Sequence, residues 1–539
     1  ADLDRWFAQN YSADQMGLVV LSNASLDDLQ ALVEPLFNQV PNYNIGPDYP
    51  TVPAYTDAQL PAMITSQTQK NAVRLSIAFP VPSTLPYYRT KPEQYISNML
   101  GHEGEGSLHS LLIQRGWIES LGAGTQSFDR NTSLISANFE LTQAGSNHVP
   151  EIMGLFFAHI DMLKSVEPEA WRYTEQAKVA ELAFQFQERG STVGFVYQMA
   201  PRLNEYPPED LLAAPYLMEG FKPDLINDLL ARMTPENVLV ELAMPDFQSP
   251  TVEPWFAVPF ALTQGPVPVA MPDNPPLNLP AANPFLPENL SLLEPDDAPI
   301  DLAVDQPGLQ LWLDTDVSFT TPRANIAIEL AVPGGLISLR DASMARLFTR
   351  LVNDELTQST YPALLAGLGY NLSRTASGFA INISGYNDKQ ADFLAFVIDQ
   401  LLTAPLAESR FDSIKQSLIR DLENAAKDKP YNQTLTALND TLLGTSWPAQ
   451  AQATLLADLT LDELSSWRSE QFKRLSVRGG LHGNVALDDA EALADLLITL
   501  LPLDRVAHTR PAVKQLTQSM DLDLAVDHND AALLLYVQD

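Results

Sequence analysis

Apolar and polar residues alternate along two stretches of the chain, residues 72–79 and 325–332. A period of two indicates strands with one buried face. The stretches are related by a constant offset of 253 residues, which also aligns Leu111-Leu112-x-x-x-Gly116-Trp117 with Leu364-Leu365-x-x-x-Gly369-Tyr370. In each copy a long helical stretch precedes the Gly-aromatic pair, and another strand follows it, at residues 136–141 and 379–384. We therefore predict two homologous units of mixed strands and helices.

A second repeat lies outside this pair. Asn23-x-x-Leu26-Asp27-Asp28-x-x-Ala31-Leu32 recurs as Asn484-x-x-Leu487-Asp488-Asp489-x-x-Ala492-Leu493, at an offset of 461 residues. Each copy follows a short apolar run (residues 18–21 and 480–481), which predicts a strand. Asn or Ser before the turn and two Asp in the first turn suit a helix N-terminus, where acceptors and negative charge are favoured.

The positions of these elements predict a fragment. In the unit that begins near residue 300, the strand–Asp-Asp–helix element comes last, yet its twin occupies residues 18–36. The chain should therefore open with the tail of a unit whose earlier part is missing. At the other end, the apolar residues 531–537 predict the first strand of a further unit.

Composition narrows the class of protein. The 539 residues include 67 Asp+Glu against 32 Lys+Arg, a net charge of −35, which disfavours nucleic-acid and membrane-surface binding. With 45% apolar and 18% charged residues the chain can bury substantial cores. It has no Cys, so disulfides and thiolate chemistry are excluded. No run approaches the roughly 18 apolar residues of a membrane-spanning helix.

Proline marks a connection between the two units. Residues 241–300 contain 14 of the 41 Pro, a density that favours extended, semi-rigid backbone. We interpret this stretch as a linker. Its aromatic residues Trp255, Phe256, Phe260 and Phe285 should pack on the flanking units.

Catalytic motifs are missing. No two His are four residues apart, as a zinc peptidase helix requires in either its direct or its inverted form. His102 and His109, with Glu103 and Glu105, leave two interpretations open: a metal site of unfamiliar spacing, or surface and capping roles. Neither a Ser nucleophile elbow nor a phosphate-binding loop is present, and Ser107 suits a helix N-cap.

Two glycine-rich stretches suggest binding. Residues 101–108 form an acidic loop that leads into a helix, and residues 121–124 follow the Gly-Trp turn. Glycine lets backbone approach a ligand closely, and exposed strand edges capture extended peptides. The alternative is two ordinary loops at helix starts.

Several motifs together resemble one known family. They are Gly101-His-Glu-Gly-x-Gly-Ser-Leu108, Gly116-Trp117, Tyr206-Pro-x-Glu-x-Leu, Pro223-Asp-Leu-Ile, Pro235-Glu-Asn-Val, Thr251-x-Glu-Pro-Trp255, Gly385-Tyr-Asn-Asp-Lys-Gln390 and Leu481-His-Gly-Asn484. Their order over nearly the whole chain is similar to that of the pitrilysin/insulin-degrading-enzyme family of zinc metallopeptidases (M16, insulinase-like).

This resemblance implies an α+β fold of tandem homologous α/β-roll units, also seen in LuxS/metallohydrolase-like proteins, with mixed sheets and helices packed on one face. The family has four such units in two halves that enclose a peptide-holding chamber. The implied map is residues 1–45 as the tail of catalytic unit one, 50–245 as unit two with a peptide exosite, 246–298 as the linker, 299–505 as unit three, and 506–539 as the start of unit four.

The resemblance also implies where the chemistry lies. The family's inverted zinc motif belongs to unit one and would precede residue 1, so neither catalytic nor metal-binding residues are expected in this chain, and Zn would be held by the parent enzyme. The exosite that grips a peptide N-terminus corresponds to Gly101, Glu103 and Leu121, with Ala123 where the family usually has Gly.

The expected function is therefore part of a zinc-dependent metalloendopeptidase that degrades short unstructured peptides. The chain would supply chamber wall and exosite, and its partners would be peptide substrates and the missing N- and C-terminal parts of the parent enzyme. The alternative is a non-catalytic, peptidase-like binding or structural subunit. The compartment is left open, although bacterial members of the family are often periplasmic.

Overall fold

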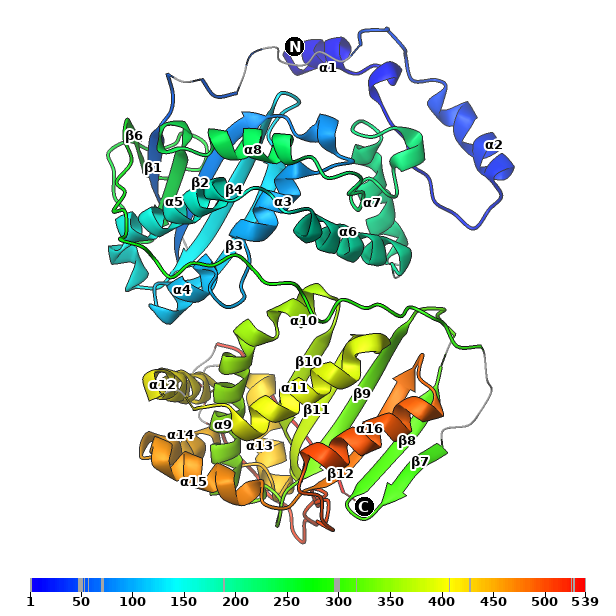
Figure 1. Ribbon diagram of the computed structural model, residues 1–539, viewed down its shortest axis with the longest axis vertical. Coiled ribbons are helices and arrows are strands. Elements are labelled where there is room, and N and C mark those ends of the chain that lie inside the picture. Colours follow the sequence, from blue (N-terminus) through cyan, green and yellow to red (C-terminus); the bar gives the residue numbers. More distant parts are fainter. Residues whose placement is uncertain are drawn as a thin grey trace. The chain divides into compact units, whose positions relative to one another are not determined.

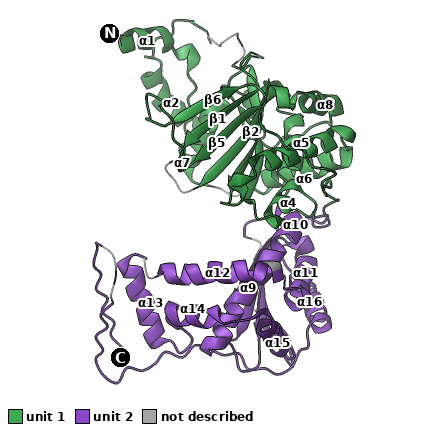
Figure 2. Cartoon of the chain, turned by 90° about the vertical axis from the view of Figure 1, so that its left-hand side faces the viewer, with its two compact units in different colours: residues 1–282 green, residues 283–539 purple. Residues whose placement is uncertain are grey.

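The computed structural model describes residues 2–46, 52, 54–56, 58–68, 72–187, 190–294, 301–316, 318–406, 408–425, 428–524, 526 and 529–538. The chain divides into two compact units, Ala1–Ala282 and Asn283–Asp539, which Figure 2 draws in different colours. None of the helices in these described ranges is long and apolar enough to cross a lipid bilayer.

The first unit contains a six-stranded mixed sheet with the order β3-β4-β2-β5-β1-β6. β1 runs parallel to β5, and every other neighbouring pair is antiparallel. The alternation predicted at residues 72–79 is confirmed as β2, and the strand predicted at residues 136–141 lies in β4. The strands are β1 (Ala62–Gln67), β2 (Val73–Pro82), β3 (Ile118–Ser127), β4 (Thr132–Leu141), β5 (Leu239–Met244) and β6 (Phe260–Gln264).

Helices cover one face of this sheet (Figure 1). Alternate side chains of β2, Leu75, Ile77 and Phe79, are buried there, and Phe79 packs on Phe156 with ring centroids 6.1 Å apart. Strand alternation thus meets the apolar stripes of the helices, and this contact forms the core. The helices are α3 (Pro92–Leu100), α4 (Leu108–Gln114), α5 (Val149–Ser165), α6 (Ala170–Gln185), α7 (Thr192–Arg202) and α8 (Pro223–Arg232).

The second unit repeats this sheet with the order β10-β11-β9-β12-β8-β7. The predicted strand at residues 325–332 is confirmed within β9. The sixth strand has a different origin in each unit, because β6 follows β5 in the chain whereas β7 precedes β8. The strands are β7 (Asp301–Gln306), β8 (Leu309–Thr315), β9 (Arg323–Ala331), β10 (Gly369–Arg374), β11 (Gly378–Tyr386) and β12 (Ser476–Gly483).

The second sheet is also covered by helices, and the predicted α+β fold of tandem units is therefore confirmed. Phe348 from a helix contacts Phe379 from β11, with ring centroids 5.7 Å apart, in a continuous buried core. The helices are α9 (Leu339–Ser359), α10 (Tyr361–Leu365), α11 (Gln390–Thr403), α12 (Glu408–Asn424), α13 (Pro430–Leu442), α14 (Ala449–Ala457), α15 (Leu461–Gln471) and α16 (Leu487–Leu500).

The two ends of the chain differ from expectation. Helices α1 (Asp2–Asn10) and α2 (Leu26–Phe37) are present, and Ser25 caps α2 by accepting a hydrogen bond from the Asp28 N–H (3.2 Å). The strands predicted at residues 18–21 and 531–537 are wrong, since both described segments are irregular. A strand needs a neighbour to satisfy its backbone, and neither segment pairs with another described strand. Leu533 and Leu535 accordingly lie 96% and 86% exposed.

The proline-rich connection follows both units closely. Its early part carries apolar side chains that pack on the core of the first unit, namely Val267, Val269, Leu277 and Leu279. Further along, Phe285 contacts Phe393 and Phe396 of the second unit, with centroids 5.4 and 6.5 Å apart, as predicted for this aromatic residue.

The packing predicted for Trp255 and Phe256 is wrong. These side chains are 87% and 83% exposed. The Glu253 carboxylate accepts hydrogen bonds from both of their backbone N–H groups, at 3.0 and 2.6 Å. The resulting tight turn directs the two rings away from the unit.

Candidate functional site

The edge strand β3 is the starting point of the candidate site. It lies at the end of the first sheet and pairs with β4 on one side only. The second glycine-rich stretch, residues 121–124, for which a loop was the alternative interpretation, lies inside this strand. Gly122, Ala123 and Gly124 leave the strand without bulky side chains at its middle. An edge strand of this kind presents N–H and C=O groups that an extended peptide can pair with.

The glycine-rich loop, residues 101–107, lies against this edge. Gly101 ends helix α3, where its N–H donates to the Ser97 carbonyl (2.9 Å). A Cβ placed on Gly101 would lie 3.2 Å from the Ala123 backbone N and 3.2 Å from the Ser97 carbonyl oxygen. The structure therefore brings Gly101 and Ala123 together, and the close approach depends on the missing side chain at residue 101.

The other end of the loop is fixed by hydrogen bonds. Ser107 accepts from the Ser110 N–H (3.1 Å) and caps α4, as its position predicted. Within the loop, the Gly104 N–H donates to His102 Nδ1 (3.0 Å). The loop is thus a defined connection between two helices, and its shape does not depend on a ligand.

The remaining two predicted residues play different parts. Leu121 is 4% exposed and belongs to the core, so only its main chain faces the strand edge. Glu103 is half-buried. Burial lowers the pKa of His109. The charge of Glu103 and its backbone carbonyl act in the opposite direction, but their effect is smaller.

Buried histidines lie behind the loop. Burial, assisted by the charge of Arg172, lowers the pKa of His102 to about 4. Burial also lowers the pKa of His159 on α5 to about 4, with a smaller contribution from His102. Nδ1 of His109 and Nδ1 of His159 find no hydrogen-bond partner among the described residues. These side chains are neutral at neutral pH.

The metal interpretation of this region finds no support in the geometry. Within the part of the chain that the structure describes, no group of three or more His, Asp or Glu side chains could hold a metal ion. The residues present therefore do not fit a zinc site, and no reaction step is assigned to a metal here.

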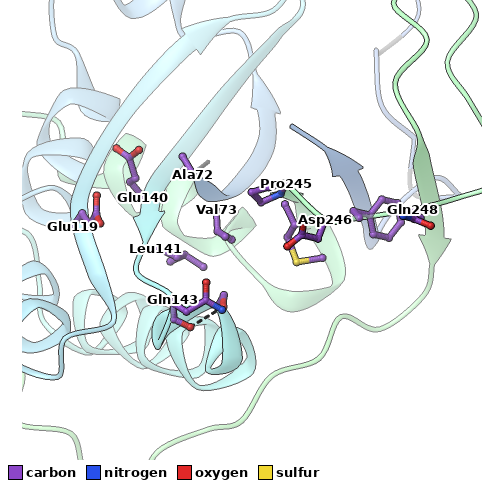
Figure 3. A pocket seen from close by; sticks show the side chains of 12 residues that line it. Ala72, Val73, Glu119, Glu140, Leu141, Gln143, Pro245, Asp246 and Gln248 are labelled. Atoms are coloured by element: carbon purple, nitrogen blue, oxygen red, sulfur yellow. Dashed lines mark hydrogen bonds between the residues drawn. The ribbon is translucent and has the colours of Figure 1, made fainter. Parts of the chain in front are cut away.

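An acidic pocket of about 550 Å³ lies at one end of the same sheet, where β3 begins and β4 and β5 end. Glu119 on β3, Glu140 on β4 and Asp246 after β5 contribute its carboxylates. Figure 3 shows the two glutamates together, with Asp246 across from them. No motif in the sequence marks this pocket, because its residues come from four strands, β2, β3, β4 and β5, and the segments that flank them.

Comparisons with known proteins agree with the fold. Residues 184–454, 271 of the 539, match the family model described as the middle or third domain of peptidase M16, and residues 1–178 match the peptidase M16 inactive domain. The chain is 31% identical to insulin-degrading enzyme of Homo sapiens, over 97% of this chain and 52% of that protein. It is 27% identical to the A-factor-processing enzyme of Saccharomyces cerevisiae, over 91% and 49% of the two chains.

A solved structure is similar as well. The crystal structure of pitrilysin superposes with a TM-score of 0.76 at 20% identity, covering 89% of this chain and 52% of that one. At this identity the likeness concerns the fold alone. The chain spans about half the length of the relatives it matches.

Proposed function

Because the chain belongs to the peptidase M16 family, we propose that it forms the peptide-holding part of a zinc-dependent endopeptidase that degrades short unstructured peptides. In this proposal the chain contributes chamber wall and an exosite, and the zinc ligands come from parts of the parent protein outside the given sequence. Peptidases of this family are generally zinc-dependent. The domain map given above, with unit two at residues 50–245 and unit three at 299–505, belongs to the same proposal.

The observation that carries the proposal is the open edge of β3 beside the 101–107 loop. An extended peptide would add a strand to β3, where Gly101 and Ala123 leave its backbone accessible. Glu103 lies on the same loop, and its carboxylate would pair with the peptide's α-amino group. Leu121 would contribute main-chain groups only, since its side chain is buried.

Electrostatics favour the same ligand class. The net charge of −35 attracts cationic peptides over a distance. Main-chain hydrogen bonding does not depend on the side chains of the bound peptide. Selection among peptides would therefore depend on an extended conformation, a free amino terminus and short length. This agrees with a peptidase that acts on unstructured substrates.

The test is a binding titration with two forms of one fluorescent, unstructured peptide, with its α-amine free or acetylated. We expect the free amine to bind about tenfold more tightly, because a charge-assisted hydrogen bond is lost on acetylation. Glu103→Gln should remove this preference. Glu105→Gln, an exposed acid on the same loop, is the matched control and should retain it. Equal affinities of wild-type protein for both peptides would contradict the proposed exosite.

The catalytic part of the proposal has its own test. Zinc content and peptide hydrolysis should be measured for this chain alone and mixed with a separately made N-terminal portion of the parent protein. Activity in the mixture only is expected. Peptide binding without zinc or hydrolysis in either sample would favour a non-catalytic binding subunit.

A further inference from the structure

The first part of the linker is fixed to the first unit as a strap, residues 266–280. Besides its apolar side chains, its Ala270 N–H donates to the Pro150 carbonyl at the start of α5 (2.9 Å). A Cβ placed on Gly154 of α5 would lie 1.8 Å from the Ala270 carbonyl oxygen. The strap therefore crosses α5 in direct backbone contact, which only glycine at this position allows.

The end of the strap reaches the glycine-rich loop. The Asn278 N–H donates to the Gly106 carbonyl (2.9 Å). Gly106 has φ +76°, and a Cβ placed on it would lie 3.1 Å from Asn278 Cβ and Nδ2. The loop that carries Glu103 is thus bound to the linker through its own backbone.

Arg172 on α6 connects the same two segments. Its side chain is 10% exposed, its Nη1 donates to the Pro280 carbonyl, and its Nε donates to Glu169 Oε2 (2.8 Å). Its guanidinium also lies over the Trp171 ring, 4.2 Å from the centroid. The charge of Arg172 acts on His102 inside the loop. One largely buried cation therefore anchors the strap at Pro280, two residues beyond the contact of Asn278 with the loop.

The next anchors belong to the second unit. Asn283 Nδ2 donates to the Pro362 carbonyl (2.7 Å), and Phe285 packs on Phe393. Only the exposed Ala281 and Ala282 separate Pro280 from this second set of anchors. The spacer between the last anchor of the strap and these anchors is therefore two residues long.

We propose that the strap holds the 101–107 loop in its peptide-binding position, and that Arg172 is the positioning residue of this contact. The inference rests on the proposed exosite and adds to it a dependence on the linker. Asn278 and Pro280 act through main-chain groups, so the coupling requires the backbone path of the strap rather than its side chains.

The test uses the full chain with Arg172→Met, which keeps the aliphatic stem and removes the donors, and Arg172→Lys, which keeps the charge. Hydrogen exchange of the backbone amides of residues 103–107 is measured without peptide. Affinity is measured with the free-amine and acetylated peptides. In Arg172→Met we expect these amides to exchange about tenfold faster and the protein to lose its preference for the free-amine peptide. In Arg172→Lys we expect both properties to return partly toward the wild-type values.

The matched control is Arg468→Met in the second unit, where Arg468 likewise donates to main-chain carbonyls, those of Ala404 and Leu402. It should leave loop exchange and peptide preference unchanged. Gly106→Ala disturbs the contact from the loop side and should reproduce the effect of Arg172→Met, which keeps the test open if the Arg172 variant does not fold.

The outcomes separate the two proposals. The positioning role would be overturned if the loop amides exchanged at the wild-type rate in both Arg172→Met and Gly106→Ala. It would also be overturned if Arg468→Met accelerated their exchange as much as Arg172→Met does. If wild-type protein binds neither peptide, the exosite proposal fails. In that case the exchange measurement alone decides whether the strap fixes the loop.

Discussion

The edge strands β3 and β10 occupy the same place in two sheets of corresponding strand order, yet only β3 has the run of small residues on which the proposed exosite depends. β3 has ten residues with Gly122, Ala123 and Gly124 at its middle, whereas β10 has six and its only Gly is its first residue, Gly369. In the first unit a glycine-rich loop separates α3 from α4. In the second, the equivalent stretch continues as the last turns of α9.

The difference lies in a few residues. At an offset of 253, Gly101 corresponds to Asp354, which lies inside α9 and forms a paired hydrogen bond with Arg410 at 2.7 and 2.9 Å. The burial pattern of each strand determines which of its side chains face the helices in both units, because alternate residues point to opposite faces of a sheet. Access to the edge is a separate property, produced by breaking one helix and removing side chains from one strand.

The largest expected difference between the units is their response to acid. His102 and His159 have pKa values of about 4 in the folded first unit against 6.5 when unfolded, so unfolding takes up protons between these pH values. The contribution of these two histidines to the free energy of unfolding is fully present above pH 6.5. It is lost as the pH falls toward 4, by roughly 3 kcal/mol for each side chain. Glu93 opposes this, because burial raises its pKa to about 7. With two histidines and one glutamate, the net loss in the free energy of unfolding by pH 4 is about 3 kcal/mol.

Hydrogen exchange at pH 7 and pH 5, resolved by unit, measures this response. The first unit should lose protection at pH 5. Glu93→Gln should enlarge the loss, and replacing both His102 and His159 by Asn should abolish it. His482→Gln, which alters an exposed histidine of the second unit, serves as the control. Equal loss of protection in both units would contradict the assignment.

The strap provides the next contrast. Helix α5 of the first unit and helix α11 of the second differ at their sixth residue, which is Gly154 in α5 and Ala395 in α11. Gly154→Ala should lower the free energy of unfolding of the first unit by about 2 kcal/mol, because the new Cβ overlaps the Ala270 carbonyl. Denaturant unfolding measures the change. Gly122→Ala, where a Cβ has no atom within 4 Å, should be nearly neutral.

A substitution at the binding edge should affect affinity more than stability. Gly101→Val would push against the Ala123 backbone and weaken peptide binding about tenfold. The control is Gly369→Val on β10, where a Cβ would meet only the Ser384 Oγ, at 3.1 Å. Fluorescence anisotropy with the free-amine peptide compares the two. Similar losses from both variants would argue against β3 as the binding edge.

The smallest effect is expected at Ala123. Ala123→Gly would let a peptide approach the strand more closely, and we expect about two- to threefold tighter binding. The same titration measures it. Weaker binding would indicate that the extra freedom of glycine outweighs the gain in access.

The repeat, the alternation and the glycine pattern were sufficient to predict the two units and the location of the loop. The sequence could not predict that residues 121–124 form a strand, because Gly and Ala have low β-propensity and only pairing with β4 fixes them. Arg172 and Asn278 were also missed. They lie about 65 and 170 residues from the loop, and nothing local marks the contact.

The sixth strands of the two sheets come from the same stretch of the chain. β6 joins the first sheet from the downstream side of its unit, whereas β7 joins the second sheet from the upstream side. The pattern that the two units share therefore comprises only five strands, and the sixth strand of each sheet comes from the sequence between the units. If the first unit were ended at residue 245, where the shared pattern ends, β6 would be removed and β1 would become an unpaired edge strand. Such a strand can pair with other molecules.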